Sequence, residues 1–164
     1  MNSCLLLLVL LGSPAPAAEG VRVEIVIPQL DARPYHRPYV AIWLETTERK
    51  GVHTLAVWHE QDEWLKDMRQ WWRKLGRSKE PPYDAVSGAT RKPGSYRVLW
   101  NGLDAEGRPL PAGEYYLNVE AAREEGGRDF LRQKVVLGGD KPQHYTLTGR
   151  GEIGEVHIEI DGGK

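Results

Sequence analysis

Two hydroxyl side chains, Ser87 and Thr90, stand in a segment bounded by Pro81-Pro82 and by Pro93-Gly94. Prolines and glycines at such positions are typical of an ordered surface loop, where a second protein can reach a side chain. A hydroxyl in such a loop can accept a phosphoryl group as an ester, and Gly88 leaves room for the approach and permits a tight turn. The same hydroxyls can instead cap backbone groups of a plain turn. Residue chemistry leaves both interpretations open.

The spacing Asp84-x-x-Ser87-Gly88-Ala89-Thr90 resembles the flavinylation motif D-x-x-[ST]-G-A-[ST], and all of its defined positions match. In proteins that bear this motif, a flavin transferase moves FMN from FAD onto the last Ser or Thr as a phosphodiester. The resemblance implies covalent FMN on Thr90. It leaves Asp84 either to fix the loop or to orient the hydroxyl.

A helix is predicted just before this loop. Asp62 can serve as its N-cap and Gly76 as its C-terminal stop. Acidic residues at its start and basic residues at its end complement the helix dipole. Its apolar residues recur at helical spacing: Trp64, Leu65, Met68, Trp71, Trp72 and Leu75.

The three helix tryptophans have two interpretations. The spacing alone favours core packing against a sheet. Indole also stacks well on planar π-systems, so Trp64, Trp71 and Trp72 are candidates to shield the isoalloxazine ring of an FMN on Thr90. The basic residues of this helix are expected on its solvent-exposed face. Alternatively, they could contact a flavin phosphate or an acidic partner. These residues are Arg69, Arg73, Lys74, Arg77 and Lys79.

The rest of the chain reads as short strands between turn signals. Val21 to Ile27 alternates apolar and polar residues, which is strand periodicity. Further apolar, β-rich runs are 39–45, 54–58, 95–100, 114–122, 130–137, 144–147 and 155–160. Many short strands with frequent turns predict an antiparallel, Ig-like β-sandwich carrying one helix over about 62–75. Trp43, Trp58 and Trp100 are expected to be buried in it.

Two resemblances extend beyond the motif. Trp100 to Tyr115 follows the pattern W-[ND]-G-x-D-x-x-G-x-P-x-P-x-G-x-Y, which is similar to a hairpin of bacterial Ig-like modules such as the flagellar hook-capping protein. The mature chain looks like the family with domain of unknown function 2271, of predicted periplasmic proteins. That resemblance implies a secreted β-sandwich associated with flavin-based extracytosolic electron transfer. It is carried by residues 39–45, 54–58, 71–73, 84–90 and 100–124.

The composition excludes several classes of protein. The chain of 164 residues has 22 basic and 23 acidic side chains and a net charge of -1, so it has no excess of positive charge with which to bind nucleic acid or an anionic membrane. Its balance of apolar and charged residues excludes collagen, coiled coils and disorder. His53 and His59 lie six residues apart without a third ligand, so no metal site is expected.

The N-terminus resembles a secretory signal peptide. The run Leu5 to Leu11 is too short to span a bilayer and is followed by Ala15-x-Ala17. We expect cleavage after Ala17, leaving residues 18–164 as one cysteine-free β-sandwich domain in the periplasm or outside the cell. No later segment could span a membrane.

Two hypotheses follow from these features. In the first, the protein is a periplasmic electron carrier with FMN on Thr90, loaded by a periplasmic flavin transferase and exchanging electrons with a membrane oxidoreductase. It would be a carrier or accessory protein rather than a stand-alone enzyme, because the sequence offers no evident substrate pocket or acid/base pair. In the second, it is a non-redox Ig-like binding or structural module in which residues 84–90 form a turn.

Overall fold

A computed structural model describes residues 20–163. The predicted signal peptide, its cleavage after Ala17 and the residue Cys4 lie outside the described residues. None of the helices that the structure describes is long and apolar enough to cross a membrane.

Nine strands and a short helical segment make up the described chain. The strands are β1 (Val21–Ile27), β2 (Tyr39–Thr46), β3 (Gly51–Trp58), β4 (Ser87–Gly88), β5 (Gly94–Trp100), β6 (Gly113–Ala122), β7 (Arg128–Leu137), β8 (Gln143–Thr148) and β9 (Glu155–Ile160). The helical pieces are η1 (Asp62–Asp67), α1 (Arg69–Trp71), η2 (Trp72–Gly76) and η3 (Asp84–Val86). Each strand expected from the sequence is present, and β4 is an addition.

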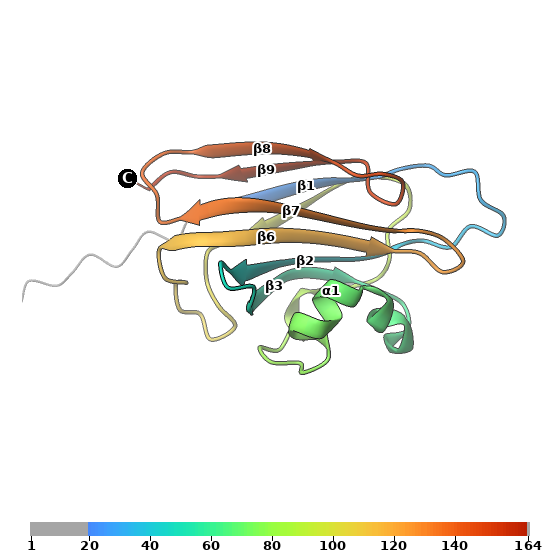
Figure 1. Ribbon diagram of the computed structural model, residues 1–164, viewed down its shortest axis with the longest axis horizontal. Coiled ribbons are helices and arrows are strands. Elements are labelled where there is room, and N and C mark those ends of the chain that lie inside the picture. The colour runs from blue at the N-terminus through green and yellow to red at the C-terminus, as the bar shows by residue number, and fades with distance from the viewer. Residues whose placement is uncertain (1–19, 164) are drawn as a thin grey trace, which may run out of the picture.

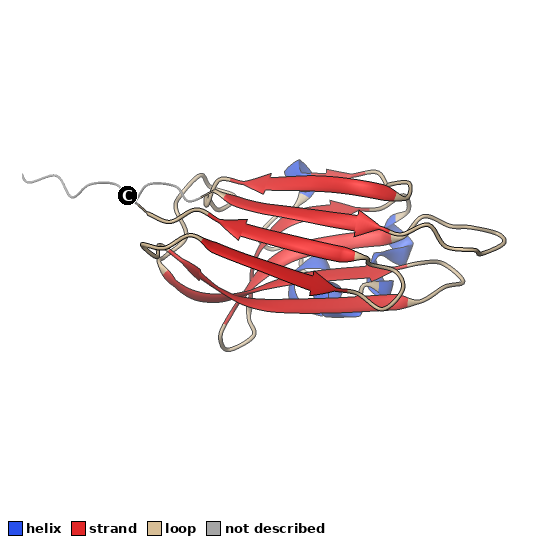
Figure 2. Ribbon diagram, turned by 90° about the horizontal axis from the view of Figure 1, so that it is seen from above, coloured by secondary structure: helices blue, strands red, loops and turns tan. Residues whose placement is uncertain are grey.

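The strands form two sheets that pack face to face, which confirms the predicted β-sandwich (Figures 1 and 2). One sheet has the order β5-β1-β9-β8 and the other β4-β3-β2-β6-β7. All pairs are antiparallel except β4, which runs parallel to β3. Alternate residues of β1, from Val21 to Ile27, point between the sheets and are buried.

A second apolar cluster lies on the outer face of the larger sheet, where the helical segment covers β2 and β3 (Figure 1). Leu65, Met68 and Trp71 pack there against residues of the two strands, including Trp43. Strand β2 is therefore buried on both faces, which explains its continuous apolar run. Trp43, Trp58 and Trp100 are all buried, as the sequence predicts.

The helical segment differs from the single helix expected over 62–75. It begins as a 3-10 helix, breaks at Met68, where φ is -77° and ψ is 72°, and resumes as α1 and a π-turn. Glu120 of β6 lies at the break and accepts the backbone N–H groups of Gln70 and Trp71. These are donors that a helix start leaves unpaired, so the restart is fixed by the sheet below. The residue at the N-cap position is Gln61 rather than the predicted Asp62, and it makes no side-chain cap.

The segment from Trp100 to Tyr115 also differs from the expected hairpin. Its flanking strands belong to different sheets, because β5 pairs with β1 whereas β6 pairs with β2 and β7. The segment is a crossover between the sheets, with a small turn closed by an isolated bridge between Leu103 and Pro109. Trp100 and Tyr115 nevertheless both belong to the core between the sheets.

Candidate functional site

The motif loop is held against the larger sheet rather than standing free of it. Asp84 lies in the short helix η3, after which Ser87 and Gly88 pair with the end of β3. The hydroxyl of Ser87 donates to the carbonyl of Tyr83 at 3.1 Å, and the N–H of His59 donates to the carbonyl of Gly88 at 2.9 Å. The position of the loop is therefore set by backbone pairing that the turn signals did not reveal.

Thr90 is buried, contrary to the expected accessible hydroxyl. The residue is only 4% exposed, and its hydroxyl donates to Oε1 of Glu60 at 2.9 Å. Glu60 follows β3, so the end of that strand brings its carboxylate to the motif. In the sequence, Glu60 is one of the acidic residues at the start of the predicted helix, and nothing there indicates a contact with Thr90. The carboxylate bonded to Thr90 thus belongs to Glu60 and not to Asp84, which is exposed.

Gly88 does not serve a tight turn. It lies in a strand without a positive φ, and a Cβ added there would lie 3.7 Å from the nearest atoms, which belong to Arg91 and Trp58. Such a separation is ordinary van der Waals contact, so the packing of this chain tolerates a side chain at Gly88. Ala89 is exposed beside it. The small residues of the motif are therefore not dictated by the fold.

The three helix tryptophans have different surroundings. Trp71 is fully buried, donates its indole N–H to Thr54 Oγ1 at 3.1 Å and packs edge-on against Tyr83. It has no face free for a ligand. Trp64 is 37% exposed and lines a small hollow of about 60 Å³ together with Glu60. Trp72 is half-buried in a different hollow.

The hollow beside Trp72 is basic and measures about 450 Å³. The charged residues of its lining are Lys66, Arg69, Arg73 and Arg128. Four of the basic residues lie on the solvent-exposed face of the segment, as predicted: Arg69, Arg73, Arg77 and Lys79. Lys74 is half-buried because its ammonium group donates to the backbone carbonyl of Arg49.

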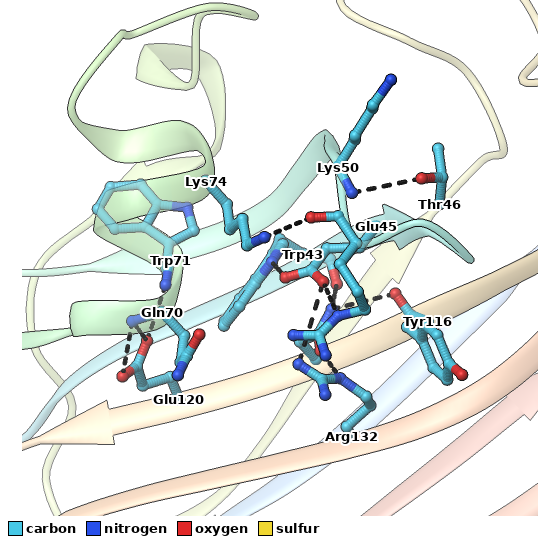
Figure 3. A network of polar contacts seen from close by, with 12 residues as sticks. Trp43, Glu45, Thr46, Lys50, Gln70, Trp71, Lys74, Tyr116, Glu120 and Arg132 are labelled. Carbon is cyan, nitrogen blue, oxygen red and sulfur yellow. Dashed lines mark hydrogen bonds and ion pairs between the residues drawn. The ribbon is translucent and has the colours of Figure 1, made fainter.

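Two buried carboxylates beneath the helical segment are structural (Figure 3). Glu45 accepts the indole N–H of Trp43 at 2.9 Å and pairs with Arg49 at 2.6 Å. Glu120 pairs with Arg128 at 2.6 Å in addition to accepting the two helix N–H groups. Both carboxylates are fully buried and their oxygens are engaged, so they are structural rather than acid/base groups. Glu120 anchors the helical segment to the sheet, whereas Glu45 joins Trp43 to Arg49.

A cleft of about 850 Å³ opens where the end of β5 and the crossover meet the loop before β4. This cleft is not evident from the sequence. Its lining is mainly apolar: Gly20, Val21, Arg22, His53, Pro82, Asp84, Ala85, Val86, Leu99, Trp100, Asn101, Leu103, Asp104 and Ala105. Thr90, Glu60 and the helix tryptophans are not part of this lining.

His53 is the one histidine that lines the cleft. It is 7% exposed, and its ring lies 5.6 Å from that of Trp100. Its Nδ1 atom is buried and has no hydrogen-bond partner among the residues that the structure describes. Burial lowers the pKa of His53, against the opposing charges of Asp104 and Glu106. Among residues 20–163, no group of three His, Cys, Asp or Glu side chains is suited to hold a metal ion.

Comparison with curated proteins and with solved structures gives no match. Residues 20–155 match the model of a family described as "Predicted periplasmic protein (DUF2271)". The match spans strands β1 to β8, the helical segment and the motif loop. The chain therefore belongs to the DUF2271 family of predicted periplasmic proteins, whose function is unknown.

Proposed function

We propose that this periplasmic protein is an electron carrier that holds FMN covalently on Thr90. The observation that carries the proposal is that the complete flavinylation motif ends in a hydroxyl hydrogen-bonded to a carboxylate, with 2.9 Å between Thr90 Oγ1 and Glu60 Oε1. A phosphoester needs a hydroxyl acceptor, and a hydrogen-bonded carboxylate is the simplest group to orient one. The bound FMN would supply the one- and two-electron chemistry.

The attachment reaction is balanced by FAD as the donor. A bond forms between Thr90 Oγ1 and the phosphorus on the FMN side of the pyrophosphate, the bridging P–O bond breaks, and AMP leaves. Thr90 must lose its proton in this step. The hydroxyl of Thr90 already donates its proton in a hydrogen bond to Glu60. Glu60 can therefore orient the hydroxyl and receive the proton as a general base.

Burial of Thr90 means that the loop must open for the transferase. Residues 89–93 join β4 to β5 and lie in neither strand, and Ala89 and Arg91 beside Thr90 are exposed. A cation–π contact ties this stretch to β3, because the guanidinium carbon of Arg91 lies 5.2 Å from the ring centroid of Trp58. Exposed segments of this kind open locally at low free-energy cost, and the small residues Gly88 and Ala89 leave room for a transferase.

Trp64 is the best placed of the three tryptophans to cover a flavin ring. It is exposed and shares its hollow with Glu60, which in turn touches Thr90. Trp71 does not fit this role because it is fully buried. The basic hollow beside Trp72 is suited instead to an acidic face of a redox partner, for which we propose a membrane oxidoreductase.

The test is expression of the chain in a periplasm together with a flavin transferase, followed by mass analysis of the tryptic peptide Glu80–Arg91. The expected result is a peptide heavier by FMN less water, with the modification on Thr90. Thr90→Ala should abolish it and Thr90→Ser should retain part of it. Ser87→Ala is the matched control and should remain modified.

Two further variants test the roles assigned to the neighbours. Glu60→Gln should slow modification, while Glu63→Gln, an exposed acid of the same region, should not. Gly88→Ala should lower modification without changing stability, because the added Cβ meets nothing closer than 3.7 Å. If the peptide stays unmodified while a known substrate is modified, the Ig-like binding module is the better hypothesis. Modification on Ser87 would keep the function and change the site.

A further inference from the structure

The cleft at the end of β5 has the size and lining of a small-molecule site. Its volume of about 850 Å³ lies within the range of roughly 300–1,000 Å³ that is common for ligand pockets, which are mostly apolar with a few placed polar groups. Leu99 is 69% exposed at this cleft. A ligand that covers this large aliphatic side chain removes apolar surface from water, which favours binding.

The polar groups of the cleft are mostly engaged within the protein. The indole N–H of Trp100 donates to the carbonyl of Leu103 at 2.8 Å. The Asp104 carboxylate accepts the N–H groups of Glu106 and Arg108, and Arg22 pairs with Glu159. These groups fix the walls of the cleft and leave their charges compensated.

His53 is the buried exception, while the carboxylate of Asp84 is exposed to solvent at the cleft. Its Nδ1 atom is buried without a hydrogen-bond partner among the described residues, and leaving such an atom unpaired destabilises the protein. Because His53 lines the cleft, a turn of its ring toward a ligand seated there would give this atom a partner. The imidazole also lies beside the indole of Trp100, with an angle of 32° between the two ring planes. Both rings belong to the lining of the cleft, so a flat aromatic molecule seated there can pack against them.

We propose that this cleft binds a planar, uncharged aromatic or quinoid molecule whose edge carbonyl or ring N–H is hydrogen-bonded by His53. An isoalloxazine ring and a naphthoquinone share this chemistry. Neither needs Thr90, since the motif hydroxyl is outside the lining of the cleft. The inference is therefore independent of covalent flavin attachment.

Two probes distinguish the two sources of such a ring. Lumiflavin supplies the isoalloxazine without a phosphate, and menadione supplies a naphthoquinone. Each is titrated by calorimetry into the mature Thr90→Ala chain, in which the proposed attachment site is removed. Saturable one-to-one binding of either probe supports the proposal and identifies its source, and binding of neither overturns it.

Variants then place the probe in the cleft. His53→Phe keeps a ring beside Trp100 and removes the hydrogen bond, so the affinity should fall about tenfold, which corresponds to ~1.4 kcal/mol. The hydrocarbon 2-methylnaphthalene should bind this variant as well as the parent. Leu99→Glu should weaken binding of both probes, whereas Val136→Glu, at an exposed apolar residue outside the cleft, should not.

The Leu99 variant keeps the proposal falsifiable if His53→Phe fails to fold, because Leu99 is exposed. Unchanged affinity in Leu99→Glu, with the fold checked by circular dichroism, would mean that the probe binds elsewhere and would overturn the assignment. Unchanged affinity in folded His53→Phe would remove His53 from the site.

Discussion

At the residue scale, Thr90 is subject to two opposing requirements. The fold buries its side chain and gives its hydroxyl to Glu60, while group transfer requires that a second protein reach the same oxygen. Both requirements are met when the loop over residues 89–93, which lies in neither strand, opens and breaks this one hydrogen bond during transfer. This arrangement makes the stability of the loop measurable through one contact.

Thr90→Ala should lower the free energy of unfolding by about 1 kcal/mol, the net contribution of a typical hydrogen bond. This exceeds the effect expected of a loop residue in water, which is usually within about 0.5 kcal/mol. Thr90→Ser should retain most of the stability. Urea unfolding of Thr90→Ala, Glu60→Ala and the double variant measures the coupling. If the two single losses simply add, the hydrogen bond is not their cause.

Asp129 is the second residue whose role is set by its contacts. Its Oδ2 atom accepts the N–H groups of Arg150 at 2.9 Å, Gly151 at 2.9 Å and Ile153 at 3.0 Å, which ties the β8–β9 connection to β7. Burial by itself raises the pKa of Asp129. The backbone hydrogen bonds outweigh burial, so the pKa lies below its ordinary 3.8.

The depressed pKa gives Asp129 a pH-dependent contribution to stability. Because the folded pKa is below the unfolded one, the contribution is complete above about pH 4 and is lost as the pH falls through the folded value. Asp129→Asn should therefore cost about 1–3 kcal/mol at pH 7, and less at pH 3. Urea unfolding at both pH values measures the difference. The exposed Asp140→Asn serves as control, and a constant difference would contradict the assignment.

At the element scale, the helical segment depends on Glu120 more than on its own sequence. The carboxylate of Glu120 caps the restart by accepting the N–H groups of Gln70 and Trp71 (Figure 3). It also pairs with Arg128. It stands where an N-cap side chain would stand in an isolated helix. The break at Met68 is thus the position at which the chain turns its next N–H groups toward β6.

Glu120→Ala should destabilise the protein by about 3 kcal/mol or more, because it leaves Arg128 unpaired and two backbone donors near the sheet unsatisfied. Hydrogen exchange at the amides of Gln70 and Trp71 should accelerate along with it. Glu63→Ala, at an exposed acid of the same segment, should change stability by no more than about 0.5 kcal/mol. Unchanged exchange in Glu120→Ala would show that packing, not capping, sets the restart.

At the scale of the whole molecule, one sheet separates two apolar clusters. Leu117 belongs to the cluster between the sheets, and Leu65 to the cluster under the helical segment. The sandwich core is formed by both sheets, whereas the outer cluster depends on a short, broken helical segment. Units of this kind differ in local stability.

Leu117→Ala and Leu65→Ala should therefore act differently, although each deletes a buried leucine and removes about 2–5 kcal/mol of favourable packing. Leu117→Ala should accelerate hydrogen exchange throughout both sheets. Leu65→Ala should accelerate it mainly over residues 62–76, leaving most of the protection of β1 and β9. Equal loss of protection everywhere in both variants would mean that the molecule unfolds as one unit.

Much of this fold could be predicted from local patterns. Period-2 alternation located β1, and turn residues separated the later strands. Burial of Trp43, Trp58 and Trp100 followed from their apolar strands. Such signals are local, because side chains alternate across a strand whatever it pairs with. The candidate site was less predictable: the motif marked Thr90, while its contact with Glu60 joins residues thirty apart.

The sequence by itself determined the strands, the sandwich class, the motif and the family resemblance, because each resides in residue types and short spacings. Tertiary structure alone decided that Trp100 and Tyr115 lie in strands of different sheets, that the helix breaks at Met68, and that Thr90 is buried. It also assembled the cleft around His53 from segments far apart in the chain. The physical reason is that pairing, capping and burial depend on partners brought close by folding, which no local pattern encodes.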